Sequence, residues 1–406
     1  MFEDVAIHNL DQLMALMQAF RADPRTQKVD LVVGVYKDEA GAVPIMSAVR
    51  KAQERVITEE TTKNYVGPAG DPDLCALVPG FVLGGDAPAV TERRTACVHT
   101  PGGSGALRVG FDLLAELNPA QRIFMCTPTW VNHVPIAKDA GLTVLEHPYF
   151  RPADRGLDFA GMMAHLDAHA AKGDAILLHA CCHNPTGVDL AAEHWETLST
   201  SLVERGVTPF IDCAYQGLGS GIEEDVAGLR TMAKHVPELM VASSFSKNFG
   251  IYRERCGALT VVTQSAENAE AVMAALKTVI RANYSMPPSL GARIVATIFA
   301  DEALREEWEA ELAVMRERVV LMRQRLRSEL EARQVRDDVS FLTAQHGMFS
   351  YTGLSPHQVE RLREDFGVYM AADGRINVAA LSEANVGVVA DAIAAVLAAE
   401  AHAPAA

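Results

Sequence analysis

A single lysine, Lys247, stands in a run of small and hydroxyl-bearing residues (SFSKNFG, 244–250). The run follows an apolar stretch, residues 239–242, that is typical of the end of a buried strand. Burial disfavours the charged form of lysine, and a neutral lysine amine can form a Schiff base with a carbonyl compound. The motif therefore predicts covalent carbonyl chemistry at Lys247. For this motif alone, a surface lysine in a serine-rich turn is the alternative.

Asp212 and Tyr215 follow a second strand-like run, residues 210–211. A carboxylate at a strand end can pair with a protonated nitrogen of a bound ligand. The phenol of Tyr215 can hydrogen-bond an oxygen of the same ligand. An isolated aspartate at this place is as often a turn former, so the interpretation depends on the neighbouring lysine motif.

A glycine-rich segment, residues 100–105 (TPGGSG), precedes a helical stripe of Leu107, Phe111, Leu114 and Leu117. Glycines let backbone N–H groups approach an anion closely, and the N-terminus of a helix carries partial positive charge. The segment therefore predicts a phosphate site. A simple turn before a helix would have the same composition.

The elements that must position these residues alternate along the middle of the chain. Strand-like runs at residues 123–125, 176–178 and 210–211 are each followed by a turn and then by helical periodicity. This rhythm predicts an α/β fold with a mostly parallel sheet, in which ligands bind at the carboxyl ends of the strands. A long helix is expected after Asp301, a candidate N-cap, because apolar residues recur at three- and four-residue steps as far as Leu330.

Together with residues 128–133 (PTWVNH) and 179–187 (HACCHNPTG), these segments resemble the class I pyridoxal-phosphate aminotransferases of the aspartate and aromatic amino acid group. The resemblance spans nearly the whole chain in consistent order. It implies fold type I, with helices on both sides of the sheet in a large domain, and a smaller α+β domain. The large domain is expected over residues 44–314. Residues 1–43, which include an N-terminal arm, and residues 315–406 are expected to form the small domain.

The resemblance implies a transaminase with pyridoxal 5′-phosphate as its cofactor, working by a ping-pong mechanism on small-molecule amino acids and 2-oxo acids. The amino group would pass from aspartate or an aromatic amino acid to the cofactor and then to 2-oxoglutarate. Three residues are expected to be catalytic. Lys247 would transfer the proton as base and then acid, while Asp212 and Tyr215 would bind the cofactor ring.

The same resemblance assigns binding roles residue by residue. The residues expected to bind the cofactor are Gly103, Ser104, Trp130, Asn184, Asp212, Tyr215, Ser244, Ser246, Lys247, Arg255 and Tyr65. Those expected to contact substrate are Gly34, Trp130, Asn184, Arg281 and Arg375. His133 is expected to orient Asp212, and His179 is expected to support the ring site from behind without touching it. A satisfied core histidine is the alternative for His133.

Two arginines match the substrate clamps of the family. Arg375 matches the arginine that grips the α-carboxylate, and Arg281 matches the one that binds the distal carboxylate of aspartate or glutamate. In the family, the counterparts of Arg281 and Tyr65 come from the neighbouring subunit, which implies a homodimer with shared active sites. Val43 and Met286 stand where aspartate enzymes usually carry threonine and asparagine. The choice between acidic and aromatic donors therefore stays open, as does a sulfonate analogue such as cysteate.

The composition excludes several classes of partner. A formal net charge of −16 argues against nucleic acid and anionic membrane surfaces, and no apolar run approaches membrane-spanning length. The N-terminus is acidic and lacks the features of a signal peptide, so we expect a cytoplasmic protein. The seven cysteines show no CxxC spacing and fit reduced thiols. We expect no metal, because the adjacent Cys181 and Cys182 next to His183 have poor ligand geometry and no second pair exists.

Two rival functions remain open at the level of the sequence. A pyridoxal-phosphate β-lyase or decarboxylase could use the same scaffold, although the two arginine clamps favour transamination of acidic substrates. A non-catalytic regulator that senses pyridoxal phosphate would usually carry a DNA-binding module, for which the chain has no room before Val32. The intact Lys247, Asp212 and Arg375 also argue against such a regulator.

Overall fold

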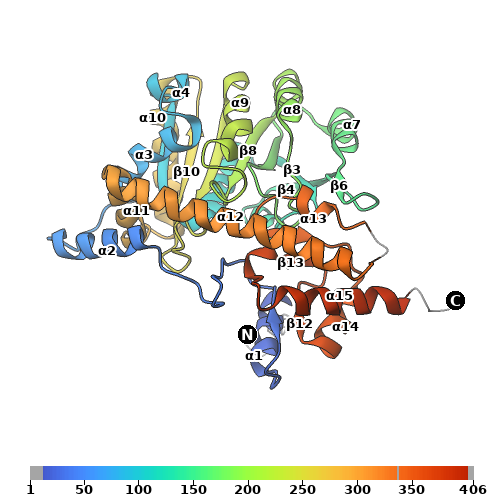
Figure 1. Ribbon diagram of the computed structural model, residues 1–406. Helices are drawn as coiled ribbons and strands as arrows, with labels where there is room; N and C mark the ends of the chain where they lie inside the picture. Colours follow the sequence, from blue (N-terminus) through green and yellow to red (C-terminus); the bar gives the residue numbers. More distant parts are fainter. Residues whose placement is uncertain (1–11, 336–337, 401–406) are drawn as a thin grey trace, which may run out of the picture. The chain divides into compact units, whose positions relative to one another are not determined.

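The computed structural model describes residues 12–335 and 338–400 (Figure 1). The chain forms two compact units. The larger unit is Pro44–Glu317, and the smaller one combines the described residues before Pro44 with those from Arg318 on. No helix in the described part of the chain is both long and apolar enough to cross a membrane.

The larger unit is built on a seven-stranded sheet (Figure 1). Its strands, in spatial order, are β2 (Thr95–Pro101), β10 (Cys256–Val262), β9 (Leu239–Ser244), β8 (Thr208–Cys213), β7 (Ala175–His179), β3 (Arg122–Thr127) and β4 (Thr143–Pro148). Strand β10 runs antiparallel to both of its neighbours, and every other pairing in this sheet is parallel. The predicted α/β class with a mostly parallel sheet is confirmed.

The central strands are buried on both faces, which explains their continuous apolar sequences. Every residue of β7 and of β9 is buried. On one face, α5 (Gly102–Leu117) and α10 (Ala266–Asn283) contribute to a single apolar core with the strands. Within it, the rings of Phe111 and Phe210 pack edge to face with centroids 5.3 Å apart.

The strand directions bring the chemical motifs to one edge of the sheet. The parallel strands β3, β7, β8 and β9 all end there, and β2 ends there as well because it runs antiparallel to β10. Strand β10 runs the opposite way, so its first residue, Cys256, pairs with Pro101 at the end of β2. The segment that precedes β10 therefore reaches the same edge as the loops that follow the other strands.

The larger unit contains further elements outside this sheet. They are α2 (Ser47–Glu59), α3 (Pro72–Leu83), α4 (Pro88–Thr91), α6 (His133–Asp139), β5 (Phe150–Arg151), β6 (Gly156–Leu157), α7 (Phe159–His169), α8 (Ala192–Arg205), a 3₁₀ turn (Glu224–Val226), α9 (Ala227–His235) and α11 (Leu290–Ala300). The long helix α12 (Glu302–Ala332) confirms the prediction from periodicity (Figure 1). Asp301 Oδ1 accepts a hydrogen bond from the Leu304 N–H at 3.1 Å, and the stripe from Leu304 to Leu330 is buried.

The smaller unit contains short strands and helices together with the part of α12 from Arg318 on. Its elements are α1 (Gln12–Ala22), β1 (Val29–Asp30), α13 (Phe341–Ala344), β11 (Phe349–Tyr351), α14 (Pro356–Phe366), β12 (Val368–Tyr369), β13 (Arg375–Asn377), a 3₁₀ turn (Val378–Ala380) and α15 (Val386–Glu400). Strand β1 pairs in parallel with β12, and β11 pairs antiparallel with β13.

Candidate active site

A cavity of about 220 Å³ lies at the carboxyl edge of the sheet. Its walls are formed by Gly103, Ser104, Leu107, Trp130, Asn184, Asp212, Ala214, Tyr215, Ser244, Ser246, Lys247, Tyr252 and Arg255. All of the residues predicted to bind the cofactor lie in these walls except Tyr65. Leu107, Ala214 and Tyr252 were not predicted. Each lies close to motif residues in the sequence, and this proximity is the only sequence feature that could have indicated its place in the cavity wall.

The turn that carries Lys247 follows β9 and is fixed by contacts of the two residues that follow the lysine. Asn248 donates from Nδ2 to the carbonyl of Gln216 at 3.1 Å, and the indole N–H of Trp308 donates to the carbonyl of Asn248 at 2.8 Å. Phe249 stacks on Trp308 with ring centroids 4.4 Å apart. Because its neighbours in sequence are locked, Lys247 has a fixed backbone position at the cavity.

The amine of Lys247 lies over the ring of Tyr215, with Nζ 4.9 Å from the ring centroid. Burial lowers the pKa of this amine below its ordinary value. The carboxylate of Asp212 opposes that shift, and the positive charge of Arg255 adds to it. The net lowering favours the neutral amine, which is the form that can accept a proton or attack a carbonyl carbon.

A hydrogen-bonded chain of side chains lies behind Asp212. His133 Nε2 lies 2.9 Å from Asp212 Oδ2, and His133 Nδ1 lies 2.8 Å from Thr129 Oγ1. Thr129 Oγ1 in turn lies 3.3 Å from His179 Nε2. Both histidines are buried, and His133 is fully enclosed. The structure therefore brings the two histidines predicted to support the ring site into one connected group, through a threonine that the sequence analysis did not single out.

The electrostatics of this group keep the Asp212 carboxylate ionised. Burial by itself raises the pKa of Asp212. The hydrogen bond from His133 is the largest of the interactions that outweigh burial, so the pKa of Asp212 lies below its ordinary value. Burial also lowers the pKa of His179 to about 3, so that imidazole is neutral at physiological pH.

The opposite end of the cavity is shaped for an anion. Gly102 has a φ of 71°, and a Cβ at this position would lie 2.5 Å from Nη2 of Arg255. A Cβ on Gly103 would lie 3.0 Å from Cβ of Ser244. A side chain at Gly102 would displace the Arg255 guanidinium and would be strained at this φ, and one at Gly103 would press on Ser244. Backbone N–H groups at the N-terminus of α5, a hydroxyl and a guanidinium are gathered in one small cradle.

The guanidinium of Arg255 is held in place by its own turn. Nη1 donates to the carbonyl of Tyr252 at 3.0 Å and to Ser246 Oγ at 3.4 Å. The backbone of Arg255 adopts a φ of 53°, a left-handed conformation that is uncommon for a non-glycine residue. Such strain is often found at binding sites, where the surrounding structure enforces it.

The side of the cavity between its two ends carries hydrogen-bonding groups and an aromatic ring. Asn184 Nδ2 donates to the hydroxyl of Tyr215 at 3.3 Å. Trp130 contacts His133 edge to face, with ring centroids 5.2 Å apart. These side chains come from the loops after β7, β8 and β3, and together they can orient a flat polar ring that enters the cavity.

Two of the predicted substrate residues, Arg375 and Gly34, belong to the smaller unit, and both lie close to the ring of Phe349. The Arg375 guanidinium lies over the ring of Phe349, 4.5 Å from its centroid, and Nη2 donates to the carbonyl of Val32 at 3.0 Å. Gly34 approaches the same ring so closely that a Cβ there would lie 2.8 Å from Cζ of Phe349. Asn377 donates from Nδ2 to the carbonyls of Val33 and Val35, at 2.6 and 2.7 Å, and fixes this segment.

Tyr65, predicted to bind the cofactor, and Arg281, predicted to bind substrate, are exposed and do not line the cavity of their own chain. Tyr65 has 87% of its surface exposed. Arg281 lies in the last turn of α10, where Nη1 donates to Ser285 Oγ at 2.7 Å. Val66, next to Tyr65 in sequence, is an exposed apolar residue, and Ile45 and Ile57 earlier in the larger unit are exposed as well.

Comparison with known proteins finds similarity along almost the entire chain. The family model for aminotransferase class I and II matches residues 26–393. The aspartate aminotransferase of Salmonella typhi is 45% identical over 397 residues, which cover 98% of this chain and 100% of that protein. The aromatic-amino-acid aminotransferase of Paracoccus denitrificans is 45% identical over 383 residues, covering 94% of this chain and 96% of that protein.

Solved structures show the same similarity. The aromatic-amino-acid aminotransferase of Burkholderia pseudomallei, covalently bound to pyridoxal phosphate, is 43% identical and superposes with a TM-score of 0.95, covering 98% of this chain and 99% of that one. An aromatic amino acid aminotransferase from Psychrobacter sp. B6, cocrystallised with aspartic acid, is 39% identical with a TM-score of 0.95, covering 98% of this chain and 100% of that one.

Proposed function

This chain belongs to the pyridoxal-phosphate-dependent class I and II aminotransferases, in the aspartate and aromatic amino acid family, and we propose that it accepts donors of both kinds. The amino group would pass from aspartate or an aromatic amino acid to 2-oxoglutarate. The observation that carries the proposal is a single cavity that holds the Lys247 amine, the Asp212 carboxylate and the anion cradle around Arg255.

The residues in the cavity fit pyridoxal 5′-phosphate. The N–H groups of Gly103 and Ser104, the hydroxyl of Ser244 and the guanidinium of Arg255 would hold its phosphate. Side chains at Gly102 and Gly103 would press on Arg255 and Ser244, two residues of this cradle. When bound, this cofactor supplies an electron sink that stabilises negative charge at the substrate α-carbon.

The other cavity residues would orient the cofactor ring. Asp212, kept ionised by His133, would accept a hydrogen bond from the protonated ring nitrogen. Asn184 and Tyr215, already in contact with each other, would bind the ring oxygen, and Trp130 would pack over the ring face. Lys247 would hold the reactive carbon of the cofactor covalently between turnovers.

Lys247 is the group that would move the proton in the chemical step. Burial lowers the pKa of the Lys247 amine below its ordinary value, which favours the neutral form that can accept a proton. Nζ would take the proton from the substrate α-carbon and return it to the cofactor carbon that receives the amino group, acting as general base and then as general acid. The Tyr215 ring, 4.9 Å from Nζ, would limit the directions in which the amine can swing.

Arg375 would bind the α-carboxylate of the substrate. The Phe349 ring and the Val32 carbonyl hold its guanidinium in one orientation, so little side-chain entropy would be lost on binding. The two compact units would correspond to the large and small domains, with Gly34 on the segment of the small domain that closes over substrate. The backbone of this segment is tied to Asn377, which ends the short strand that begins with Arg375.

A homodimer would complete each active site. Tyr65 and Arg281 are exposed on their own chain, and Ile45, Ile57 and Val66 are exposed apolar residues of the same unit. A second copy would cover such apolar side chains, and each subunit would lend Tyr65 to the phosphate and Arg281 to the substrate of its partner. We place such a dimer in the cytoplasm, with reduced cysteines.

The experiment that tests this function is a single-turnover absorbance screen of purified enzyme. Aspartate, glutamate, phenylalanine, tyrosine and cysteate would each be added, and the change in the cofactor band would be followed. We expect acidic and aromatic donors to convert the cofactor and release the matching 2-oxo acid. A response to cysteate alone would favour the sulfonate alternative. Release of ammonia or carbon dioxide would favour a lyase or decarboxylase, and no response to any donor would contradict the proposal.

A further inference from the structure

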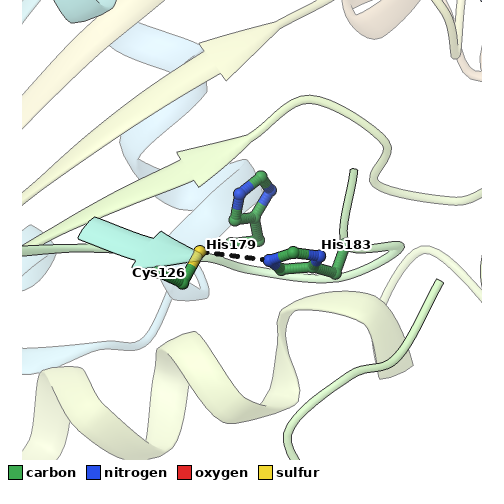
Figure 2. Close-up of side chains that lie close together, drawn as sticks. All are labelled: Cys126, His179 and His183. Carbon is green, nitrogen blue, oxygen red and sulfur yellow. Dashed lines mark hydrogen bonds between the residues drawn. The ribbon is translucent and has the colours of Figure 1, made fainter. Parts of the chain in front are cut away.

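Three buried side chains that can bind a metal ion converge behind the ring site. Cys126 lies on β3, His179 ends β7, and His183 lies in the loop that follows (Figure 2). One ligand atom from each residue lies within 4.8 Å of the other two. Figure 2 shows the Cys126 thiol directed toward the His183 ring, where Sγ and Nε2 are 3.2 Å apart, with the His179 ring beside them.

The supports around His183 fix the nitrogen that faces the thiol. His183 Nδ1 lies 2.8 Å from Thr186 Oγ1, and the ring of Tyr149 stacks on the imidazole with centroids 4.2 Å apart. The backbone N–H of His183 donates to Asp189 at 2.8 Å. Metal-binding histidines are held in this way, with one nitrogen engaged by a hydrogen bond and the other left to face the ion.

From this arrangement we propose that Cys126, His179 and His183 form a binding site for a thiophilic divalent cation of the zinc class. Zinc prefers cysteine sulfur and histidine nitrogen, at about 2.3 Å and about 2.0–2.1 Å respectively. In a tetrahedral site these bond lengths separate sulfur and nitrogen by about 3.5 Å. The 3.2 Å between Cys126 Sγ and His183 Nε2 requires a small outward shift, and the ligand atom of His179, which lies within 4.8 Å of both, would move inward to complete the site. The fourth position would be taken by water.

The binding step is a simple exchange. The S–H bond of Cys126 breaks, a bond between sulfur and the metal forms, and the proton passes to the buffer. The two imidazoles supply lone pairs, and nothing is oxidised or reduced. Because the hydrogen-bonded contact between Cys126 and His183 already brings sulfur and nitrogen together, the ion replaces the thiol proton without unfolding the site.

The proposed metal site is connected to Asp212 through a chain of side-chain contacts. His179 is connected through Thr129 to His133, which contacts Asp212. An ion that draws the His179 ring toward Cys126 would lengthen the contact between His179 and Thr129 and loosen the support of Asp212. We therefore expect occupancy of the site to lower kcat, with little change in KM.

Zinc binding to the pyridoxal-phosphate-loaded enzyme is measured by equilibrium dialysis and by X-ray absorption at the zinc edge. We expect one Zn²⁺ per chain, with one sulfur neighbour at about 2.3 Å and nitrogen neighbours at about 2.0–2.1 Å. Cys126→Ala should lose this ion, and its activity should no longer fall when Zn²⁺ is added. The matched control is Cys256→Ala, which removes a buried thiol on β10 outside the group.

Cys182→Ala tests the second group of ligand-type side chains in the described part of the chain, Cys181, Cys182 and Asp225. Loss of zinc in Cys182→Ala with full retention in Cys126→Ala would overturn the proposal. So would a zinc spectrum without a sulfur neighbour, which needs no variant and therefore does not depend on how Cys126→Ala folds. Cys126→Ser keeps the volume of the side chain and should bind zinc far more weakly than the parent.

Discussion

His133 Nε2 and Asp212 Oδ2 lie 2.9 Å apart, and this contact fixes the charge on the wall of the cavity. Burial of Asp212 favours its neutral form, so an unsupported carboxyl at this place would hold a proton more tightly. His133 reverses that tendency and is itself held by Thr129. The pair therefore keeps a negative charge where a cofactor nitrogen would need one.

The first prediction concerns the pH dependence set by this pair. The pKa of Asp212 is depressed in the folded protein, so the carboxylate stays ionised until the pH falls well below the ordinary range. In His133→Ala the raising effect of burial remains while the hydrogen bond is lost. The pKa of Asp212 should rise, and the acid limb of kcat/KM should move to higher pH. The measurement is the pH profile, with the exposed His235→Ala as control. An equal loss of activity at every pH would show that His133 only fills space.

The second prediction concerns Lys247. General acid–base catalysis contributes about 10²–10⁴-fold to the rate of proton transfer. Lys247→Ala removes this contribution together with the covalent anchor, so we expect a loss of activity of at least this size and a shifted cofactor absorbance band. Lys234→Ala, which changes an exposed lysine on α9, should leave both unchanged. Turnover of Lys247→Ala near the parental rate would show that Lys247 does not transfer the proton.

The third prediction concerns the anion cradle. A hydrogen bond to a charged group contributes about 1.5–3 kcal/mol, so Arg255→Ala should weaken cofactor binding by about tenfold to 150-fold. The measurement is a titration of cofactor-free protein with pyridoxal phosphate. Arg253→Ala is the matched control, since Arg253 is exposed and only two residues away. Parental affinity in Arg255→Ala would show that the guanidinium does not hold the phosphate.

The fold and much of the cavity could be predicted from the sequence because buried parallel strands are continuous apolar runs and because the lysine, aspartate and glycine motifs each follow one. The antiparallel direction of β10 could not be predicted, since its sequence is as apolar as that of its parallel neighbours. That direction is what carries Arg255 to the same edge as Lys247. The role of Arg255 was expected from the family resemblance alone.

Contacts between residues far apart in the sequence were also beyond prediction. Thr129 joins two histidines that are 46 positions apart, and Cys126 meets His183 across 57 positions. No pattern in the sequence around Thr129 or Cys126 indicates which distant histidine it contacts. The predicted roles of Tyr65 and Arg281 depend on a second copy of the chain, so they stay predictions here.

The fourth prediction concerns donor selectivity. Arg281 offers charge complementarity to aspartate and glutamate, whereas aromatic side chains gain nothing from its charge. Removal of one partner from a desolvated charge pair costs about 2–5 kcal/mol. Arg281→Ala should therefore reduce kcat/KM for aspartate by about 30-fold to several thousandfold, with a much smaller effect for phenylalanine. The two donors are measured with the same protein preparation. Equal losses would show that Arg281 does not contact the substrate side chain.

The last prediction is that two inactive variants restore aspartate turnover when their subunits exchange. If Arg281 acts in the partner's active site while Lys247 acts in its own, a dimer of Lys247→Ala and Arg281→Ala chains has one site with both defects and one site with neither. Aspartate activity should then approach one native site for each mixed dimer. Mass analysis confirms that mixed dimers have formed, and phenylalanine serves as the internal control because it does not require Arg281. If mixed dimers form and aspartate activity stays at the level of the parents, then Arg281 acts within its own chain and the shared site is wrong.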